Sequence, residues 1–343
     1  MRLLTTFRFL LSSSLLLVAL LAHPSASHAG EDINILFLGN SFTLRHNIRD
    51  QVEKILEEGD PDTNVNTSQV IYGGQNMFAH STYYFSQSFI EQSTITNEEI
   101  AARIEKMKGF LASDTPPNQE EWDTHWASVG RSGKVPFAGI HRHIQGAIRN
   151  HQRLLADNPK TKWDYVVLQS WADVSPDPEQ GYAKYATKLA KIARKQGADI
   201  VLYMTSPRTQ NKEPVSEPLS PESADRDMAI ALELVKRIRP KAIVPVPLAI
   251  KKIQTGGTDL VFRYVNDFHP NQTCAFLTTN LFYAALTGKS PEGFAFDTIV
   301  ETKVRDGKDP DGGDPKVVFD KKTKTYLQKM AFQTVQEFEQ LAK

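Results

Sequence analysis

Apolar and polar positions along the chain fall into short, regular segments. Residues 33–38 are almost continuously apolar and run directly into Gly39-Asn40-Ser41. A short apolar run that ends at a glycine is typical of a buried strand followed by a tight turn. From residue 47 to residue 56 the apolar residues instead recur on one face of a helix. The pattern therefore predicts a strand, a turn and a helix, in that order.

The same order recurs along the rest of the chain. Further strands are predicted to include residues 70–72, 165–168, 200–204 and 243–246. Amphipathic helical patterns lie between them, for example at residues 182–195 and 224–237. Short apolar strands that alternate with helices predict a three-layer α/β sandwich, in which a mainly parallel five-stranded sheet is covered by helices on both faces.

The stretch between the second and third predicted strands is too long for a single crossover. It carries at least two helical patterns of its own, and Thr96 and Glu99 form a possible capping box before the first. We interpret residues 80–162 as a helical insertion and not as a second domain. Residues 30–343 are then predicted to form one domain that ends in a loop and a helix at about 305–343.

The first 29 residues have the features of a secretory signal peptide. Arg2 and Arg8 flank an apolar run at residues 9–22, and the small residues around Ala29 follow it. The alternative is a membrane anchor, but this run falls short of the about 20 apolar residues that span a bilayer. Cleavage near Ala29 predicts a periplasmic or secreted protein with no stable membrane anchor.

The composition limits the classes of partner that the chain is expected to bind. The chain has 40 Lys and Arg against 40 Asp and Glu, and it has no basic tract, so nothing predicts binding to nucleic acid. This balance favours a small or uncharged substrate. The single Cys274 cannot form an intramolecular disulfide, so in an oxidising compartment the fold must rest on its hydrophobic core.

Two sequence segments could supply a nucleophile and a base. Ligands of open parallel sheets bind beyond the carboxyl ends of the strands, and Ser41 follows the first strand at such a position. His269 precedes an apolar helix at residues 275–286, and a histidine is the usual base for a serine because its pKa lies near the working pH. Either residue alone could be an ordinary turn or cap residue. Together they are a candidate nucleophile and base.

These segments resemble the sequence blocks of the SGNH (GDSL-like) hydrolase superfamily. Its first block, Gly-Asp-Ser, is matched by Gly39-Asn40-Ser41 with Asn in place of Asp. Its fifth block, Asp-x-x-His-Pro, resembles residues 266–270. The resemblance covers residues 34–72 and 164–286, and it leaves the insertion and the C-terminal tail unexplained.

The resemblance implies a flavodoxin-like sheet and a serine esterase. Ser41 would be the nucleophile and His269 its base, and the backbone N–H groups of Ser41 and Gly74 would form part of an oxyanion hole. No metal and no organic cofactor is implied. The alternative is a non-catalytic protein of the same fold that binds glycans.

The sequence departs from the family blocks at two positions, those of the oxyanion donor and of the residue that orients the histidine. The third strand ends in Gln169 where the family has an Asn that donates to the oxyanion, and Gln169 carries the same amide donor on a longer side chain. The residue three before the histidine is Asn266, whereas the nearest carboxylate, Asp267, lies two before it. Because Pro270 favours an extended backbone, Asp267 would share a face with His269; we favour it and retain Asn266 as the alternative.

Other conspicuous residues carry weaker predictions. His125, His141 and His143 lack the spacing of a metal site, and we interpret them as surface histidines of the insertion. An aromatic group in the insertion could stack against sugars or pack a core; it comprises Tyr83, Tyr84, Phe85, Trp122 and Trp126. Export and these aromatic residues favour a carbohydrate O-acetyl ester, or another small ester, as the substrate.

Overall fold

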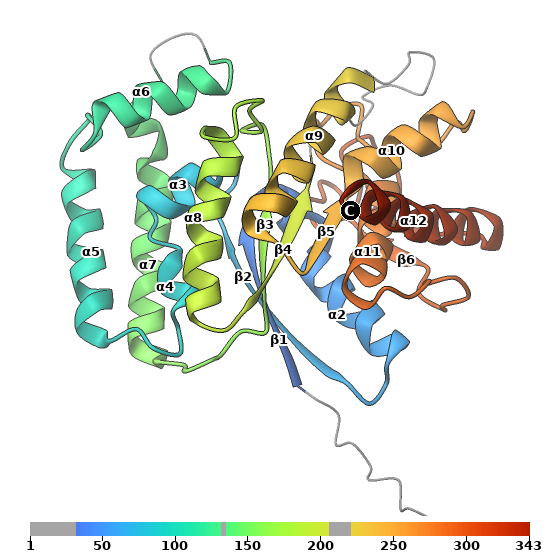
Figure 1. The fold of residues 1–343 in the computed structure, drawn as a ribbon, viewed down its shortest axis with the longest axis horizontal. Helices are drawn as coiled ribbons and strands as arrows, with labels where there is room; N and C mark the ends of the chain where they lie inside the picture. The colour runs from blue at the N-terminus through green and yellow to red at the C-terminus, as the bar shows by residue number, and fades with distance from the viewer. Residues whose placement is uncertain (1–31, 132–134, 206–220) are drawn as a thin grey trace, which may run out of the picture.

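The computed structural model describes residues 32–131, 135–205 and 221–343 of the 343-residue chain (Figure 1). The predicted signal peptide, residues 1–29, lies outside the described residues.

A parallel sheet of five strands forms the centre of the fold, in the order β2-β1-β3-β4-β5. The strands are β1 (Asp32–Gly39), β2 (Asn64–Ile71), β3 (Tyr165–Gln169), β4 (Asp199–Met204) and β5 (Ala242–Pro245). The predicted α/β sandwich is confirmed. Strand β2 begins six residues before the predicted segment at 70–72, because it is an edge strand whose polar residues hide the apolar pattern.

Side chains of successive strand residues point into two separate cores. In β1, Ile35 and Phe37 pack on one face of the sheet, whereas Leu36 and Leu38 pack on the other. The first face is covered by α2 (Ile48–Gly59), α10 (Val246–Thr255), α11 (Gln272–Thr287) and α12 (Lys321–Leu341). The second face is covered by α8 (Gly181–Lys195), α9 (Pro221–Ile238) and the insertion (Figure 1).

The insertion between β2 and β3 is helical, as the sequence predicts. It contains α3 (Met77–Thr82), α4 (Gln87–Ile90), α5 (Asn97–Leu111), α6 (Gln119–Ser128), the 3₁₀ turn η2 (Phe137–Ile140) and α7 (His141–Asp157). The capping box of Thr96 and Glu99 begins α5. The aromatic group identified above is buried, with Tyr83 and Tyr84 fully so. It therefore packs a core and offers no surface for stacking sugars.

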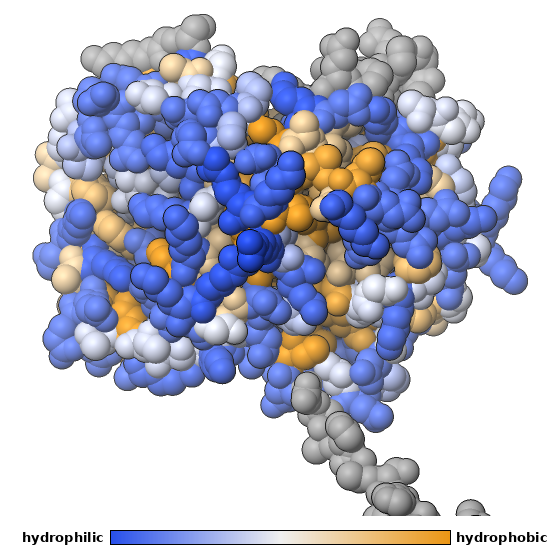
Figure 2. Space-filling view, viewed as in Figure 1, coloured by the Kyte–Doolittle hydropathy of each residue, from blue (hydrophilic) through white to orange (hydrophobic). Residues whose placement is uncertain are grey.

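The C-terminal segment adds a small antiparallel pair of strands, β6 (Thr298–Val300) and β7 (Lys316–Val318). Strand β7 lies in the stretch that the sequence predicts as loop, since a strand of three residues leaves little periodic signal. Hydrophilic residues cover most of the face seen in Figure 2, and apolar residues show mainly between them near its middle. No helix in the described ranges is both long enough and apolar enough to span a bilayer.

Candidate active site

Ser41 lies at the carboxyl end of β1, where the sequence predicts it. It is the first residue of the short helix α1 (Ser41–Leu44), which Asn40 caps by accepting a hydrogen bond from the Phe42 N–H at 3.0 Å. The 3₁₀ turn η1 (Arg45–Asn47) follows, and His46 and Asn47 both have positive φ. This turn separates α1 from α2 and leaves Ser41 at the edge of the sheet.

His269 reaches the Ser41 hydroxyl from the other end of the chain. Its Nε2 lies 2.7 Å from the Ser41 Oγ. The segment that carries it is held by an antiparallel bridge between Arg263 and Pro270, and Asn271 then caps α11 by accepting a hydrogen bond from the Cys274 N–H. The sequence pattern of a histidine just before an apolar helix therefore corresponds to a fixed position beside Ser41.

Asp267 contacts the opposite nitrogen of the same imidazole. Its Oδ1 forms a close hydrogen bond with the His269 Nδ1 and also accepts one from the His269 N–H at 3.1 Å. A carboxylate has no proton to give, so Nδ1 is the donor and Nε2 is left to accept the serine proton. Asn266 is exposed, and its backbone N–H donates to Asp311. Of the two predicted partners of His269, the structure places Asp267 in contact.

The charges around Asp267 keep it ionised. Burial alone would raise its pKa, but hydrogen bonds from His269 and Lys303, together with Arg45, hold the pKa of Asp267 well below its usual value. Its Oδ2 lies 3.1 Å from the Arg45 Nη1 and 3.0 Å from the Lys303 Nζ. Burial lowers the pKa of His269, and Asp267 offsets this only in part, so the imidazole is neutral at neutral pH.

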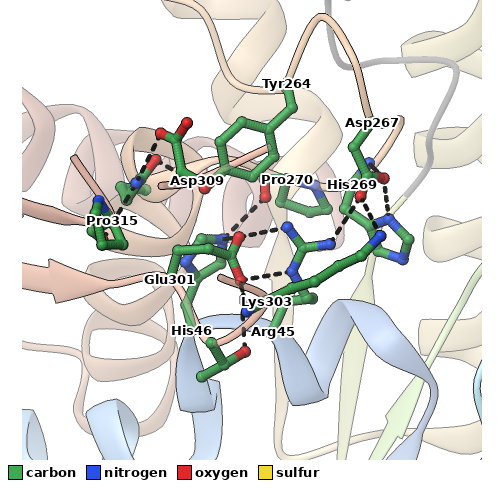
Figure 3. A network of polar contacts seen from close by, with 12 residues as sticks. Arg45, His46, Tyr264, Asp267, His269, Pro270, Glu301, Lys303, Asp309 and Pro315 are labelled. Atoms are coloured by element: carbon green, nitrogen blue, oxygen red, sulfur yellow. Dashed lines mark hydrogen bonds and ion pairs between the residues drawn. The ribbon is translucent and has the colours of Figure 1, made fainter. Parts of the chain in front are cut away.

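A buried ion pair behind Asp267 fixes Arg45 (Figure 3). The Arg45 Nε donates to the Glu301 Oε1 at 2.7 Å, and Nη2 forms a close contact with Oε2. His46 lies beside this pair and donates from Nε2 to the Pro270 carbonyl at 2.9 Å. Burial would raise the pKa of Glu301, but Arg45 holds it below its ordinary value.

Sequence reasoning did not identify Arg45, Glu301 or Lys303. Arg45 follows Ser41 by four residues, which is the one local signal of its place. Glu301 and Lys303 come just after β6, in the C-terminal segment that the family resemblance leaves unexplained. They reach the site only through the tertiary fold.

The loop after β2 supplies the other predicted element of an oxyanion hole. Gly74 has φ +67°, a left-handed conformation that glycine adopts without strain, and it borders the same cleft as Ser41. Ser41 begins a helix, so its N–H has no acceptor in the preceding turn. The two backbone donors are thus in the neighbourhood where the carbonyl oxygen of an ester would lie.

The predicted oxyanion role of Gln169 does not fit its hydrogen bonds. Both Nε2 protons are used, because Nε2 donates to the Asn40 Oδ1 at 2.9 Å and to the Ser170 carbonyl at 3.1 Å. Its Oε1 accepts hydrogen bonds from the Asn40 N–H and from the Thr43 hydroxyl. Gln169 is buried, and its hydrogen bonds join the Gly-Asn-Ser turn to β3. It therefore stabilises the turn that carries Ser41 and has no amide proton left for a ligand.

A cleft of about 840 Å³ opens beside Ser41 and His269. Its lining includes the apolar Leu44, Trp171 and Phe268, together with Arg142 and His143 from α7 of the insertion. The insertion therefore borders the candidate site through α7, and not through the aromatic group that the sequence analysis considered for binding sugars.

The three histidines of the insertion are less exposed than predicted. His125 is buried against Asn76, and burial lowers its pKa to about 3. His141 is half-buried and contacts the Ser113 carbonyl, while His143 borders the cleft. Over the residues with described positions, no three His, Cys, Asp or Glu side chains gather as a metal site would require.

Comparisons with known proteins add only distant similarities. No family model matches the chain, and no curated protein is similar to it in sequence. Two solved structures are similar in fold. One is a DUF4886 family protein from Bacteroides uniformis, with 14% identity and a TM-score of 0.46 over 89% of this chain and 95% of that one. The other is a protein assigned provisionally to the SGNH hydrolases, from Slackia heliotrinireducens, with 15% identity and a TM-score of 0.37 over 75% of this chain and 100% of that one.

Proposed function

We propose that this protein is a serine esterase. The observation that carries the proposal is the continuous hydrogen-bonded chain from Ser41 through His269 to Asp267, which lies at the edge of a cleft. A serine hydroxyl is a weak nucleophile until a neighbouring base removes its proton, and the base must itself be oriented by a third group. The three side chains have the contacts that these roles require.

In the proposed reaction, the Ser41 Oγ attacks the ester carbonyl carbon while His269 Nε2 takes the hydroxyl proton. The carbonyl oxygen becomes negative in the tetrahedral intermediate and is stabilised by the N–H groups of Ser41 and Gly74. The bond to the alcohol then breaks, and His269 returns its proton to the leaving oxygen. In the second half of the reaction His269 deprotonates a water molecule, which attacks the acyl carbon. The bond to the Ser41 Oγ then breaks, and His269 returns the proton to that oxygen, which releases the acid and regenerates the serine.

Asp267 has two roles in this scheme. It holds the imidazole in the tautomer whose Nε2 can accept a proton, and its negative charge stabilises the imidazolium that forms in the transition state. Arg45 and Lys303 keep Asp267 ionised and fix its orientation, while Glu301 balances the charge of Arg45.

We also propose that the enzyme is exported. The predicted signal peptide at residues 1–29 supports this, and cleavage would release the enzyme into the periplasm or the medium. A carbohydrate O-acetyl ester or another small ester fits an extracellular enzyme with an open cleft, and the proposed reaction uses no metal or organic cofactor.

The test is hydrolysis of an activated acetyl ester by the wild type and by Ser41→Ala. We expect activity that the substitution abolishes. Because His269 must be neutral and burial lowers its pKa below 6.5, kcat/KM should stay level above that pH and fall about tenfold per pH unit below the pKa. A correctly folded wild type without esterase activity, or a Ser41→Ala variant that retains it, would contradict the proposal; an inactive protein that binds glycans would favour the alternative function.

A further inference from the structure

The cleft beside the proposed nucleophile carries an excess of positive charge. Arg45, Arg142 and Lys303 border it, and of the residues placed by the structure, no Asp or Glu does so. Arg45 and Lys303 are both ion-paired with Asp267, and Arg45 also with Glu301. Two carboxylates therefore offset two of the three cations, and the charge of Arg142 is left over.

Arg142 is exposed and forms no ion pair within residues 32–131, 135–205 and 221–343, but its side chain has one hydrogen-bond partner. Its Nε donates to the His143 Nε2 at 3.1 Å. His143 packs against the rings of Tyr72 and Tyr84, and burial together with Arg142 lowers its pKa to about 4. His143 is therefore a neutral acceptor at neutral pH. It engages the inner nitrogen of the guanidinium and leaves the two terminal nitrogens without a hydrogen-bond partner in the described ranges.

The position of Arg142 in its helix strengthens the local field. It is the second residue of α7, and the first turn of this helix contains no acidic residue. The amino end of a helix has a partial positive charge, which disfavours a cation and attracts an anion. A guanidinium placed there without a carboxylate concentrates positive potential at the cleft.

We infer that the cleft recognises an ester that carries a carboxylate near the scissile bond, and that Arg142 is the residue that binds this carboxylate. The inference rests on the proposed esterase function and narrows its substrate class. A guanidinium matches a carboxylate with two parallel N–H···O hydrogen bonds, and the two terminal nitrogens of Arg142 are available to donate them. Leu44, Trp171 and Phe268 provide apolar contact for the body of the substrate. The near-zero net charge of the chain gave no sign of this preference, since the excess is local.

The carboxylate could belong to the acyl group or to the alcohol, and two matched substrate pairs distinguish these sources. For the acyl side, kcat/KM is compared for para-nitrophenyl hexanoate and the mono-para-nitrophenyl ester of adipic acid. For the alcohol side, it is compared for phenyl acetate and meta-carboxyphenyl acetate. Within each pair the partners differ mainly in the carboxylate, so the ratio of the anionic to the neutral ester reports the charge preference.

We expect at least one ratio to exceed one in the wild type, and Arg142→Gln to lower that ratio about tenfold, the effect of losing a charge-assisted hydrogen bond. Arg149→Gln is the matched control, since Arg149 is an exposed arginine of the same helix that does not border the cleft; it should leave the ratio unchanged. Added NaCl should lower the wild-type ratio by screening.

Ratios at or below one in both pairs, or a ratio that Arg142→Gln does not change, would overturn the inference. The esterase proposal would survive that result if the neutral esters are still hydrolysed by the wild type and not by Ser41→Ala. A wild type that hydrolyses none of the four esters would contradict both.

Discussion

The edge of the sheet and the core of the insertion contain nearly the same serine–histidine hydrogen bond. At the edge, the His269 Nε2 lies 2.7 Å from the Ser41 Oγ; in the insertion, the His151 Nε2 lies 2.7 Å from the Ser88 Oγ. In both histidines the Nδ1 faces an acceptor, which fixes the same tautomer. Distance and tautomer alone therefore do not distinguish a reactive pair from a structural one.

The surroundings of the two pairs differ in access and charge. Ser88 and His151 are fully buried, the acceptor at the His151 Nδ1 is the Ala147 carbonyl, and Arg103 also donates to Ser88. Burial lowers the pKa of His151 to about 4. Among the residues that the structure places, no carboxylate forms a hydrogen bond or ion pair with His151, and the burial of Ser88 keeps a substrate from reaching it. Solvent access and a carboxylate behind the histidine, more than the serine–histidine bond itself, therefore define the candidate site.

Replacing each histidine by alanine should give the largest difference between the two serine–histidine pairs. We expect His269→Ala to lower kcat by about 10⁶-fold, the loss seen when the base of a serine triad is removed. His151→Ala should instead cost about 1–3 kcal/mol of stability, because it leaves a buried hydroxyl without its acceptor, while the folded fraction stays active. Esterase rates normalised to folded protein would separate the two, and equal losses of activity would contradict the distinction.

Removal of the carboxylate behind His269 should cause the next largest loss of activity. Asp267→Ala should lower kcat by about 10⁴-fold, because the imidazole loses both its orientation and the charge that stabilises its protonated form. Asn266→Ala is the control, since Asn266 is exposed and its backbone N–H donates to Asp311. Steady-state kinetics of both variants, after circular dichroism confirms folding, would test this. Loss of turnover only in Asn266→Ala would show that Asn266, at the family's spacing, orients His269 and that Asp267 does not.

The smallest effect concerns the ion pair that supports the carboxylate. Glu301→Gln should reduce the free energy of unfolding by about 3 kcal/mol, because it leaves the buried Arg45 charge without its main partner. Glu179→Gln breaks an ion pair with Arg237 at the surface and should cost less than about 1 kcal/mol. Urea denaturation measures both free energies of unfolding. A loss in Glu301→Gln as small as that in the control would show that Glu301 does not stabilise the buried charge of Arg45.

The fold could be predicted from the sequence because buried strands and amphipathic helices leave periodic patterns. Ser41, His269 and Asp267 could be predicted as candidates, and the structure brings them into contact. Each lies in a short segment with a recognisable order of residues. Glu301 and Arg142 could not be predicted, because Glu301 follows a three-residue strand and Arg142 lies in a long insertion. Only the tertiary fold brings Glu301 to Arg45 and Arg142 to the cleft. The oxyanion role predicted for Gln169 does not fit the hydrogen bonds of its amide, which the sequence does not reveal.

The claim that Ser41 is the nucleophile is tested most directly by locating the reactive serine. The wild-type protein is incubated with a fluorophosphonate, which forms a covalent bond with an activated serine, and the labelled peptide is identified by mass spectrometry. We predict a single adduct on Ser41, which disappears in His269→Ala, and no adduct on Ser88. Absence of labelling across the pH range in which His269 is neutral, or labelling at Ser88, would contradict the claim that the edge of the sheet is the active site.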